Sequence, residues 1–162
     1  MTRSVRDMKY DAFDVRILER LQRDAGEDRQ ALADAVGLSA SQVARRRQAL
    51  EAVGVIRGYR AELDPRLAGV PVLVFITVRL REHSPENHAR FAALLDALPQ
   101  VLEAHMLTGD SDYELKVRVR DLDDLSALVN DHLLTHAAVD RVKSNLVLKT
   151  LKESAALPLA PS

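Results

Sequence analysis

The feature that most constrains the fold is a glycine turn between two capped helical segments. Residues 28–36 show helical spacing of apolar side chains, and Asp28 stands at the N-cap position. Gly37 then supplies the left-handed conformation that commonly ends a helix. Ser39 and Gln42 have the spacing of a capping box, which begins the next helix. Two helices joined by a short glycine turn form a helix-turn-helix motif.

A third helix precedes this pair, and a short β-prone segment follows it. Asp11 and Asp14 are spaced as an N-cap and its reciprocal acid, which predicts a helix that begins at Ala12. After the last helix, two glycines bracket the β-prone stretches 55–56 and 59–63. These stretches predict a two-stranded wing beside the three helices.

The last helix and the wing carry side chains that suit contacts with a DNA duplex. Guanidinium groups bind phosphates and the guanine edge, and hydroxyl and amide groups bind either phosphates or bases. Three helices with an arginine-rich surface also occur in simple solvated bundles, so this alternative stays open on the pattern alone. The residues expected to contact DNA are Ser39, Ser41, Gln42, Arg45, Arg46, Arg57 and Arg60.

Composition supports a soluble protein with its positive charge in the first part of the chain. The net charge is −1, but residues 1–62 hold 12 Lys and Arg against 10 Asp and Glu, whereas residues 63–162 hold 11 against 14. The sequence contains no cysteine, which excludes disulfides and thiolate metal sites. No apolar run reaches the roughly 18 to 20 residues of a membrane helix, and the N-terminus lacks the apolar core of a signal peptide. We therefore expect a cytoplasmic protein.

The second part of the chain alternates strand and helix patterns in the order β-α-β-β-α-β. This is the order of a ferredoxin-like domain, in which helices cover one face of a four-stranded sheet. The first of these strands is apolar on both faces, which predicts that its open face packs against a partner subunit. We therefore expect at least a dimer. The predicted strands span 72–80, 101–108, 114–120 and 142–151, and the predicted helices begin at Ser84-Pro85 and Leu122.

The predicted fold class is α+β, with an N-terminal winged helix-turn-helix domain and a C-terminal ferredoxin-like domain for ligand sensing and oligomerisation. The expected boundaries are 1–63 for the first domain, 64–71 for a linker, 72–153 for the second domain and 154–162 for a tail. The tail is rich in Ala, Pro and Leu, and we expect it to extend loosely or to pack along a neighbouring subunit.

Histidines offer two alternatives to a binding protein. His132 and His136 are four residues apart on a predicted helix, but no further ligand at a supporting spacing completes a metal site. His105 could be combined with Ser111 and Asp110 as a catalytic triad, yet no nucleophile elbow or oxyanion-forming glycine run accompanies them. We therefore expect no catalytic residues, no metal and no cofactor.

From about residue 10 to residue 153, the chain resembles the Lrp/AsnC family of regulators. The resemblance rests on motifs in both halves, among them Val36-Gly37-Leu38-Ser39, Gly54-Val55-Ile56, Gly58-Tyr59 and Thr108-Gly109-Asp110-Ser111-Asp112-Tyr113. The last of these is similar to the family's G-D-x-D-Y turn. The resemblance implies a transcription regulator that binds double-stranded DNA as a homodimer, tetramer or octamer. It also implies that an amino acid or a related metabolite controls its activity or assembly.

The resemblance places the effector near the G-D-x-D-Y turn. Carboxylates there could bind the ammonium group of an amino acid, and backbone N–H groups of the turn could bind its carboxylate. The residue types also fit an ordinary β-turn, which leaves a second function open: an architectural DNA-binding protein without a physiological ligand. The residues expected to bind the effector are Gly109, Asp110, Asp112, Tyr113 and Ser144.

Three positions depart from the family pattern. Arg47 stands where the family usually has an aliphatic residue, so we expect its stem to lie along the edge of the helical core. Ala31 replaces the acid that would complete a capping box, which leaves Asp28 to cap its helix alone. Val142 stands where many members carry a threonine near the effector, so the sequence leaves the effector's identity open.

Overall fold

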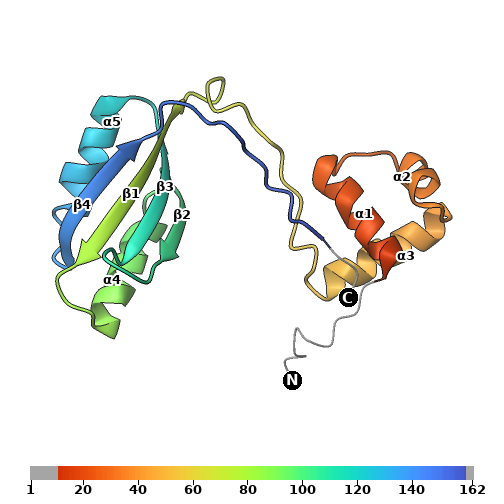
Figure 1. The fold of residues 1–162 in the computed structure, drawn as a ribbon, viewed down its shortest axis with the longest axis horizontal. Helices are drawn as coiled ribbons and strands as arrows, with labels where there is room; N and C mark the ends of the chain where they lie inside the picture. Colours follow the sequence, from red (N-terminus) through yellow and green to blue (C-terminus); the bar gives the residue numbers. More distant parts are fainter. Residues whose placement is uncertain (1–10, 160–162) are drawn as a thin grey trace. The chain divides into compact units, whose positions relative to one another are not determined.

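The computed structural model describes residues 11–159 and divides the chain into two compact units. One unit combines the N-terminal part, up to Glu62, with the C-terminal segment from Lys152, and the other unit spans Leu63–Leu151. The chain therefore passes between the two units twice (Figure 1). Within the described residues, no helix has both the length and the apolar character needed to cross a membrane.

The N-terminal unit contains three helices whose predicted caps are confirmed. Asp11 and Asp14 cap each other reciprocally at the start of the first helix, and Ser39 and Gln42 do the same at the start of the third. Gly37 ends the second helix in the left-handed conformation, with φ of 74°. The helices are α1 (Ala12–Arg23), α2 (Arg29–Val36) and α3 (Ala40–Ala52).

A small apolar core holds the three helices together, and α2 is capped as expected. The carboxylate of Asp28 accepts the backbone N–H groups of Gln30 (2.8 Å) and Ala31 (3.2 Å). Because residue 31 is alanine, no side chain returns a hydrogen bond to the cap. The buried side chains that join α1, α2 and α3 are Ile17, Leu21, Leu32, Ala33, Val36 and Val43.

Residues 53–63 follow α3 without forming strands, so the predicted two-stranded wing is wrong. The backbone N–H of Ile56 donates to the carbonyl of Leu50 at 3.2 Å, and the side chain of Ile56 packs against the helical core. The hydroxyl of Tyr59 donates to Glu51 at 2.8 Å. These contacts hold the segment on α3, whereas an isolated two-stranded ribbon is only marginally stable in water.

The second unit is a four-stranded antiparallel sheet with helices on one face, as the ferredoxin-like prediction required. The strand order is β2-β3-β1-β4, and α4 and α5 both lie on the same side of the sheet (Figure 1). The elements are β1 (Val72–Leu80), α4 (Pro85–Asp96), β2 (Val101–Met106), β3 (Tyr113–Val119), α5 (Leu122–Ala127), the π-helical segment η2 (Leu128–Leu133) and β4 (Val139–Leu146).

The last strand and the last helix differ from their predicted forms. β4 ends at Leu146, which pairs with Val74 of β1, so the predicted end at residue 151 is wrong. The helix that begins at Leu122 ends in a π-helical turn, in which the N–H of Leu134 donates to the carbonyl of Val129 at 2.9 Å. Apolar spacing gave no sign of this wider turn.

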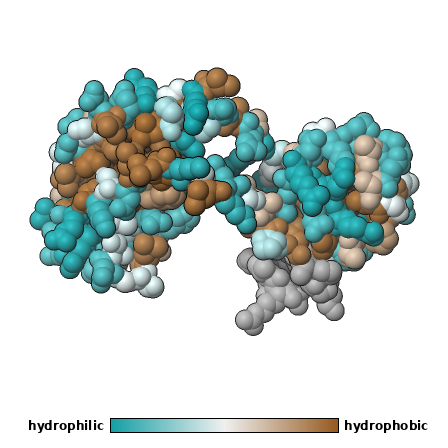
Figure 2. Space-filling model, turned by 45° about the horizontal axis from the view of Figure 1, so that its top comes forward, coloured by the Kyte–Doolittle hydropathy of each residue, from teal (hydrophilic) through white to brown (hydrophobic). Residues whose placement is uncertain are grey.

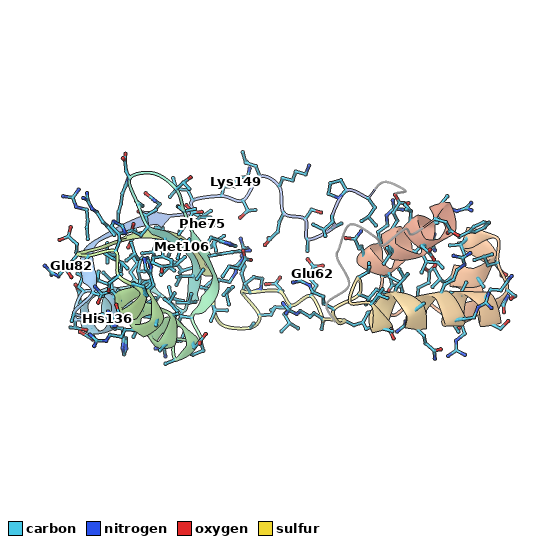
Figure 3. The ribbon with its side chains drawn as sticks, turned by 90° about the horizontal axis from the view of Figure 1, so that it is seen from below. Glu62, Phe75, Glu82, Met106, His136 and Lys149 are labelled. Carbon is cyan, nitrogen blue, oxygen red and sulfur yellow. The ribbon has the colours of Figure 1, made fainter. Side chains whose placement is uncertain are left out.

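The two faces of the sheet differ in character. On the helix-covered face, Val74, Ile76 and Val78 of β1 are completely buried and pack with Phe91 of α4. The open face presents Phe75 of β1, and Phe75 lies on the opposite side of the sheet from His136, which is close to the helices (Figure 3).

The open face is apolar only in its centre. Beside Phe75, the register places Lys116 of β3 and Asn145 of β4, so charged and polar side chains flank the central strand. The alternating pattern of β3 thus puts its charged residues on this face. Figure 2 shows apolar side chains gathered in one area of this unit and hydrophilic ones around it.

The C-terminal segment packs against α1 of the N-terminal unit. The amide side chain of Gln22 accepts the backbone N–H of Leu157 (2.6 Å) and donates to its carbonyl (3.2 Å). The amide of Gln22 therefore bonds both backbone groups of Leu157, as a neighbouring strand would do in a β-sheet. The segment is therefore held by its own chain at Leu157, so the expected loose extension is wrong there, and packing along a neighbouring subunit stays a prediction.

Candidate nucleic-acid interface and effector turn

The outward side of α3 exposes polar side chains, while Val43 and Leu50 point into the core. Ser41, Gln42 and Arg45 are all exposed. Within residues 11–159 the guanidinium of Arg45 has no ion-pair or hydrogen-bond partner. An exposed guanidinium on a capped helix after a glycine turn is suited to a contact in the major groove.

The capping box limits what Gln42 can offer to a base. Its Oε1 accepts the backbone N–H of Ser39 at 2.9 Å and the hydroxyl of Ser39 at 3.0 Å. The hydroxyl of Ser39 also lies 3.1 Å from that of Ser41. Recognition of adenine by glutamine needs both the oxygen and the nitrogen of the amide. With its oxygen engaged, Gln42 is a donor through Nε2, which suits an acceptor on a base edge or a phosphate.

Arg46 differs from Arg45 because it is engaged inside the protein. Its guanidinium lies 2.9 Å from a carboxylate oxygen of Asp14 and 3.0 Å from one of Asp11, and it stands over the ring of Phe13 at 5.5 Å. The hydrogen bond to Asp14 raises the pKa of Arg46. Backbone N–H donation from Asp14 lowers the pKa of Asp11, and Arg46 adds to this effect. Arg46 therefore fastens α3 to the start of α1.

Arg47 and the residues after α3 complete this surface. The guanidinium of Arg47 stacks on the ring of Tyr59 at 4.5 Å and donates to the carboxylate of Glu51 at 3.1 Å. These contacts hold the side chain of Arg47 against the C-terminal part of α3. Arg57 and Arg60 are exposed on the segment that follows, and neither has an ion-pair partner within the described residues.

The 109–112 turn is built by contacts with β1. Its ends are closed by the N–H of Leu107, which donates to the carbonyl of Asp112 at 2.8 Å. The carboxylate of Asp112 accepts the backbone N–H of Leu80 at 2.6 Å. The backbone N–H of Asp112 donates to the carbonyl of Val78 at 2.9 Å. Only 14% of the Asp112 side chain is exposed. Asp112 therefore holds the turn in place, whereas Asp110 is exposed.

Two histidines that the sequence pattern did not single out lie beside this turn. His83 Nδ1 is 3.4 Å from the carboxylate of Asp112, and His88 Nδ1 is 2.5 Å from the hydroxyl of Tyr113. Burial raises the pKa of Tyr113, and the charge of Asp112 adds to this effect. Both histidines flank the N-cap of α4, but no spacing in the sequence relates them to a turn so far along the chain.

The structure does not bring Ser144 to the turn in a single chain. Ser144 lies opposite Ile76 on β4, whereas Tyr113 lies opposite Val78 on β3, and β1 separates the two strands. Ser144 is exposed, as are Gly109 and Asp110. In a single chain, β1 therefore separates Ser144 from the other expected effector residues, of which Gly109 and Asp110 are exposed and Tyr113 is buried.

The remaining histidines have simple surroundings. His105 Nε2 lies 3.3 Å from Glu103, and no hydrogen bond joins it to Ser111 or Asp110 in the described part of the chain. His136 Nδ1 accepts the N–H of Ala138 at 3.3 Å, and His132 is exposed. Across residues 11–159, no three His, Asp or Glu side chains come together as metal ligands.

Two family models match the units described above. The AsnC-type helix-turn-helix domain matches residues 11–51, and the Lrp/AsnC ligand binding domain matches residues 73–157. The chain belongs to the Lrp/AsnC family of transcriptional regulators. The helix-turn-helix and the four-stranded sheet are thus the DNA-binding and ligand-binding domains of this family.

Relatives match along nearly the whole chain. The leucine-responsive regulatory protein of Haemophilus influenzae is 36% identical over 149 residues, which are 92% of this chain and 90% of that protein. The glutamate uptake regulatory protein of Zymomonas mobilis is 36% identical over 151 residues, which are 93% of this chain and 92% of that protein. Both regulators are therefore matched along nearly their whole length.

Solved structures show the same fold. A transcriptional regulator of Neisseria meningitidis in complex with L-Met matches with a TM-score of 0.89 at 35% identity, covering 92% of this chain and 96% of that one. AsnC of Escherichia coli matches with a TM-score of 0.84 at 26% identity, covering 93% of this chain and all of that one (100%).

Proposed function

We propose that this Lrp/AsnC regulator reads its operator with the outward face of α3 and responds to an amino acid bound at the 109–113 turn. The observation that carries the first half is the exposed guanidinium of Arg45, which has no partner within residues 11–159 and lies on a helix that begins with a reciprocal capping box. In helix-turn-helix proteins the N-terminal part of the second helix contacts base edges in the major groove.

Each residue of the interface has a distinct role in this proposal. Arg45 contacts a guanine edge or a phosphate, and Gln42 donates through Nε2. Arg57 and Arg60 contact the flanking phosphates. Ser39 and Ser41 contact a DNA phosphate at the start of α3, where the unsatisfied N–H groups of the helix favour an anion. Arg46 adds positive charge but acts mainly by holding α3 against α1.

The open face of the sheet supports assembly into a homodimer. Phe75 and its neighbours on β1 would be covered in a homodimer, and further association would give the tetramer or octamer that the family resemblance implies. A two-fold dimer places its two recognition helices about one helical turn of DNA apart, about 34–36 Å. The operator should therefore be approximately palindromic.

The second half of the proposal, effector binding, rests on the different roles of the two carboxylates in the turn. Asp112 is already bonded to Leu80, so Asp110 is the carboxylate that can bind an ammonium group. Exposed N–H groups near Gly109 would bind the carboxylate of the same amino acid. Tyr113 supports the turn from within, and Ser144 would join the site in the assembled protein. The Neisseria relative in complex with L-Met supports an amino acid as the ligand class.

Fluorescence anisotropy with the gene's own upstream DNA tests the first half. Arg45→Ala should weaken binding, whereas Arg23→Ala, which removes an exposed arginine from the far end of α1, should leave it nearly unchanged. Binding should also weaken steeply with salt, because phosphate contacts release counterions. Binding that is indifferent to both salt and Arg45→Ala would refute the proposed interface.

A thermal-shift screen with the twenty amino acids tests the second half. A ligand at 100 times its dissociation constant stabilises the folded state by about 2.7 kcal/mol. The shift given by the active amino acid should disappear in Asp110→Asn. A flat screen would favour the alternative function, an architectural DNA-binding protein without a physiological ligand.

A further inference from the structure

Gln48 is an exposed residue on the outward side of α3. Ser41 and Arg45, which are also exposed, precede it by seven and three residues, and side chains at these spacings lie on one side of a helix. Val43 and Leu50 of the same helix are buried in the core on the other side. Gln48 therefore shares the outward face of α3 with Ser41 and Arg45.

The side-chain amide of Gln48 has no hydrogen-bond partner within residues 11–159. One helical turn before it and one turn after it stand Ala44 and Ala52, whose side chains carry no polar atom. Glu51, three residues after Gln48, already accepts bonds of 3.1 Å and 2.8 Å from two other side chains. Both the oxygen and the nitrogen of the Gln48 amide are therefore available to a ligand.

Gln42, the other glutamine of α3, offers less to a base. One atom of its amide faces the backbone N–H of Ser39 at 2.9 Å, and a backbone N–H can only donate, so this atom is the oxygen. Recognition of adenine needs both atoms of the amide: the oxygen accepts from N6 of the base and the nitrogen donates to N7. In the described part of the chain, only Gln48 of these two glutamines keeps both atoms available.

The spacing along α3 relates Gln48 to the base pair that Arg45 contacts. Three residues of an α-helix rise by about 4.5 Å. Successive bases of one DNA strand are about 3.4 Å apart along the axis of the duplex. Helix residues at intervals of about three can therefore contact successive bases in the major groove. A helix that brings Arg45 to one base pair brings Gln48 to a neighbouring one.

We propose that Gln48 is a specificity-determining residue that binds adenine in the major groove, at a base pair next to the one that Arg45 contacts. Its Oε1 accepts from N6 of the adenine, and its Nε2 donates to N7. This inference rests on the proposed function, because it requires the outward face of α3 to lie in the major groove. A two-fold dimer repeats the preference for adenine in both half-sites of the operator.

A panel of duplexes based on the gene's own upstream DNA, each with one base pair of the half-sites replaced, tests this preference. Replacement of one A·T pair by G·C should weaken binding of the wild type about fivefold or more, because a bidentate contact contributes at least about 1 kcal/mol of discrimination. Gln48→Ala should bind both duplexes alike. This variant should fold, because residue 48 is exposed and alanine favours helices. A Gln48→Ala protein with the base preferences of the wild type at every position would overturn the proposal.

Base analogues at the identified adenine test the two hydrogen bonds separately. 7-Deazaadenine lacks the N7 acceptor, and purine lacks the N6 amino group. Each analogue should weaken binding of the wild type and should leave binding of Gln48→Ala unchanged. Equal losses in the two proteins would mean that another group contacts this adenine, which contradicts the assigned role of Gln48.

Two further variants provide controls. Gln30→Ala removes a glutamine of α2 whose Nε2 already donates to Asp34 at 2.8 Å, and it should keep the preference for adenine. Loss of the preference in Gln30→Ala would contradict the proposal. If Arg45→Ala keeps its discrimination between the operator and a scrambled duplex, the proposed interface itself is wrong. If Arg45→Ala loses discrimination while Gln48→Ala keeps every base preference, only the role of Gln48 is wrong.

Discussion

Two glycine turns, one in each unit, are stabilised in different ways. At the first, Gly37 (φ 74°) is surrounded by bonds to near neighbours, such as the donation from Leu38 to Ala33 at 3.0 Å. At the second, which contains Gly109 (φ 127°), Asp112 bonds to β1 residues more than thirty positions away. The helical turn is thus a local structure, whereas the turn at Gly109 depends on the sheet. Under the proposed function, a ligand at the second turn would act directly on the end of β1.

The largest predicted effect is on the second turn. Asp112→Ala removes the buried acceptor of the Leu80 N–H, and hydrogen bonds to charged groups contribute about 1.5–3 kcal/mol. We expect a loss of about 2 kcal/mol in the free energy of unfolding by urea. Asp110→Ala, at an exposed position, should change it by less than about 0.5 kcal/mol. Equal losses in the two variants would show that the carboxylates do not differ in role.

The next effect is on the first turn. A Cβ at position 37 would meet no atom within 4 Å, so Gly37→Ala costs only the strain of the left-handed conformation. That strain is about 1–2 kcal/mol for an L-residue. Gly37→Asn should cost less, because asparagine adopts this conformation more readily. If alanine and asparagine destabilise the protein equally in thermal unfolding, strain is not the cause.

The smallest effect is a gain at α2. Ala31→Glu would complete a capping box with Asp28 and should raise the free energy of unfolding by about 0.5 kcal/mol. Ala35→Glu adds the same charge at an exposed position near the end of α2, where a negative charge is unfavourable. Stabilisation by both variants would mean that charge alone, and not the reciprocal cap, is responsible.

The contrast between the turns also explains what the sequence could predict. The caps at Asp11, Asp28 and Ser39 depend on neighbours within three positions, so their motifs were sufficient. The alternation of β3 was equally clear, because only one face of this strand is buried. These local signals were enough for the fold of both units.

Partners distant in the sequence could not be predicted. Arg46 and Arg45 are adjacent and alike, yet only Arg46 reaches Asp14 across the helix contact. His83 and His88 meet the effector turn because β1 and β3 pair in one particular register. The prediction of a two-stranded wing was wrong for the same reason. The hydroxyl of Tyr59 bonds to Glu51 on α3, and the β-propensity of the segment does not reveal this contact.

The most direct test of the central claim compares Arg45 and Arg46 in operator binding. Affinities for the operator and for a scrambled duplex would be measured at one salt concentration for wild type, Arg45→Ala and Arg46→Ala. Arg45→Ala should cost about 1–3 kcal/mol on the operator and reduce discrimination between the two duplexes. Arg46→Ala should mainly lower the melting temperature. If a folded Arg46→Ala protein loses discrimination while Arg45→Ala keeps it, the proposed reading face of α3 is wrong.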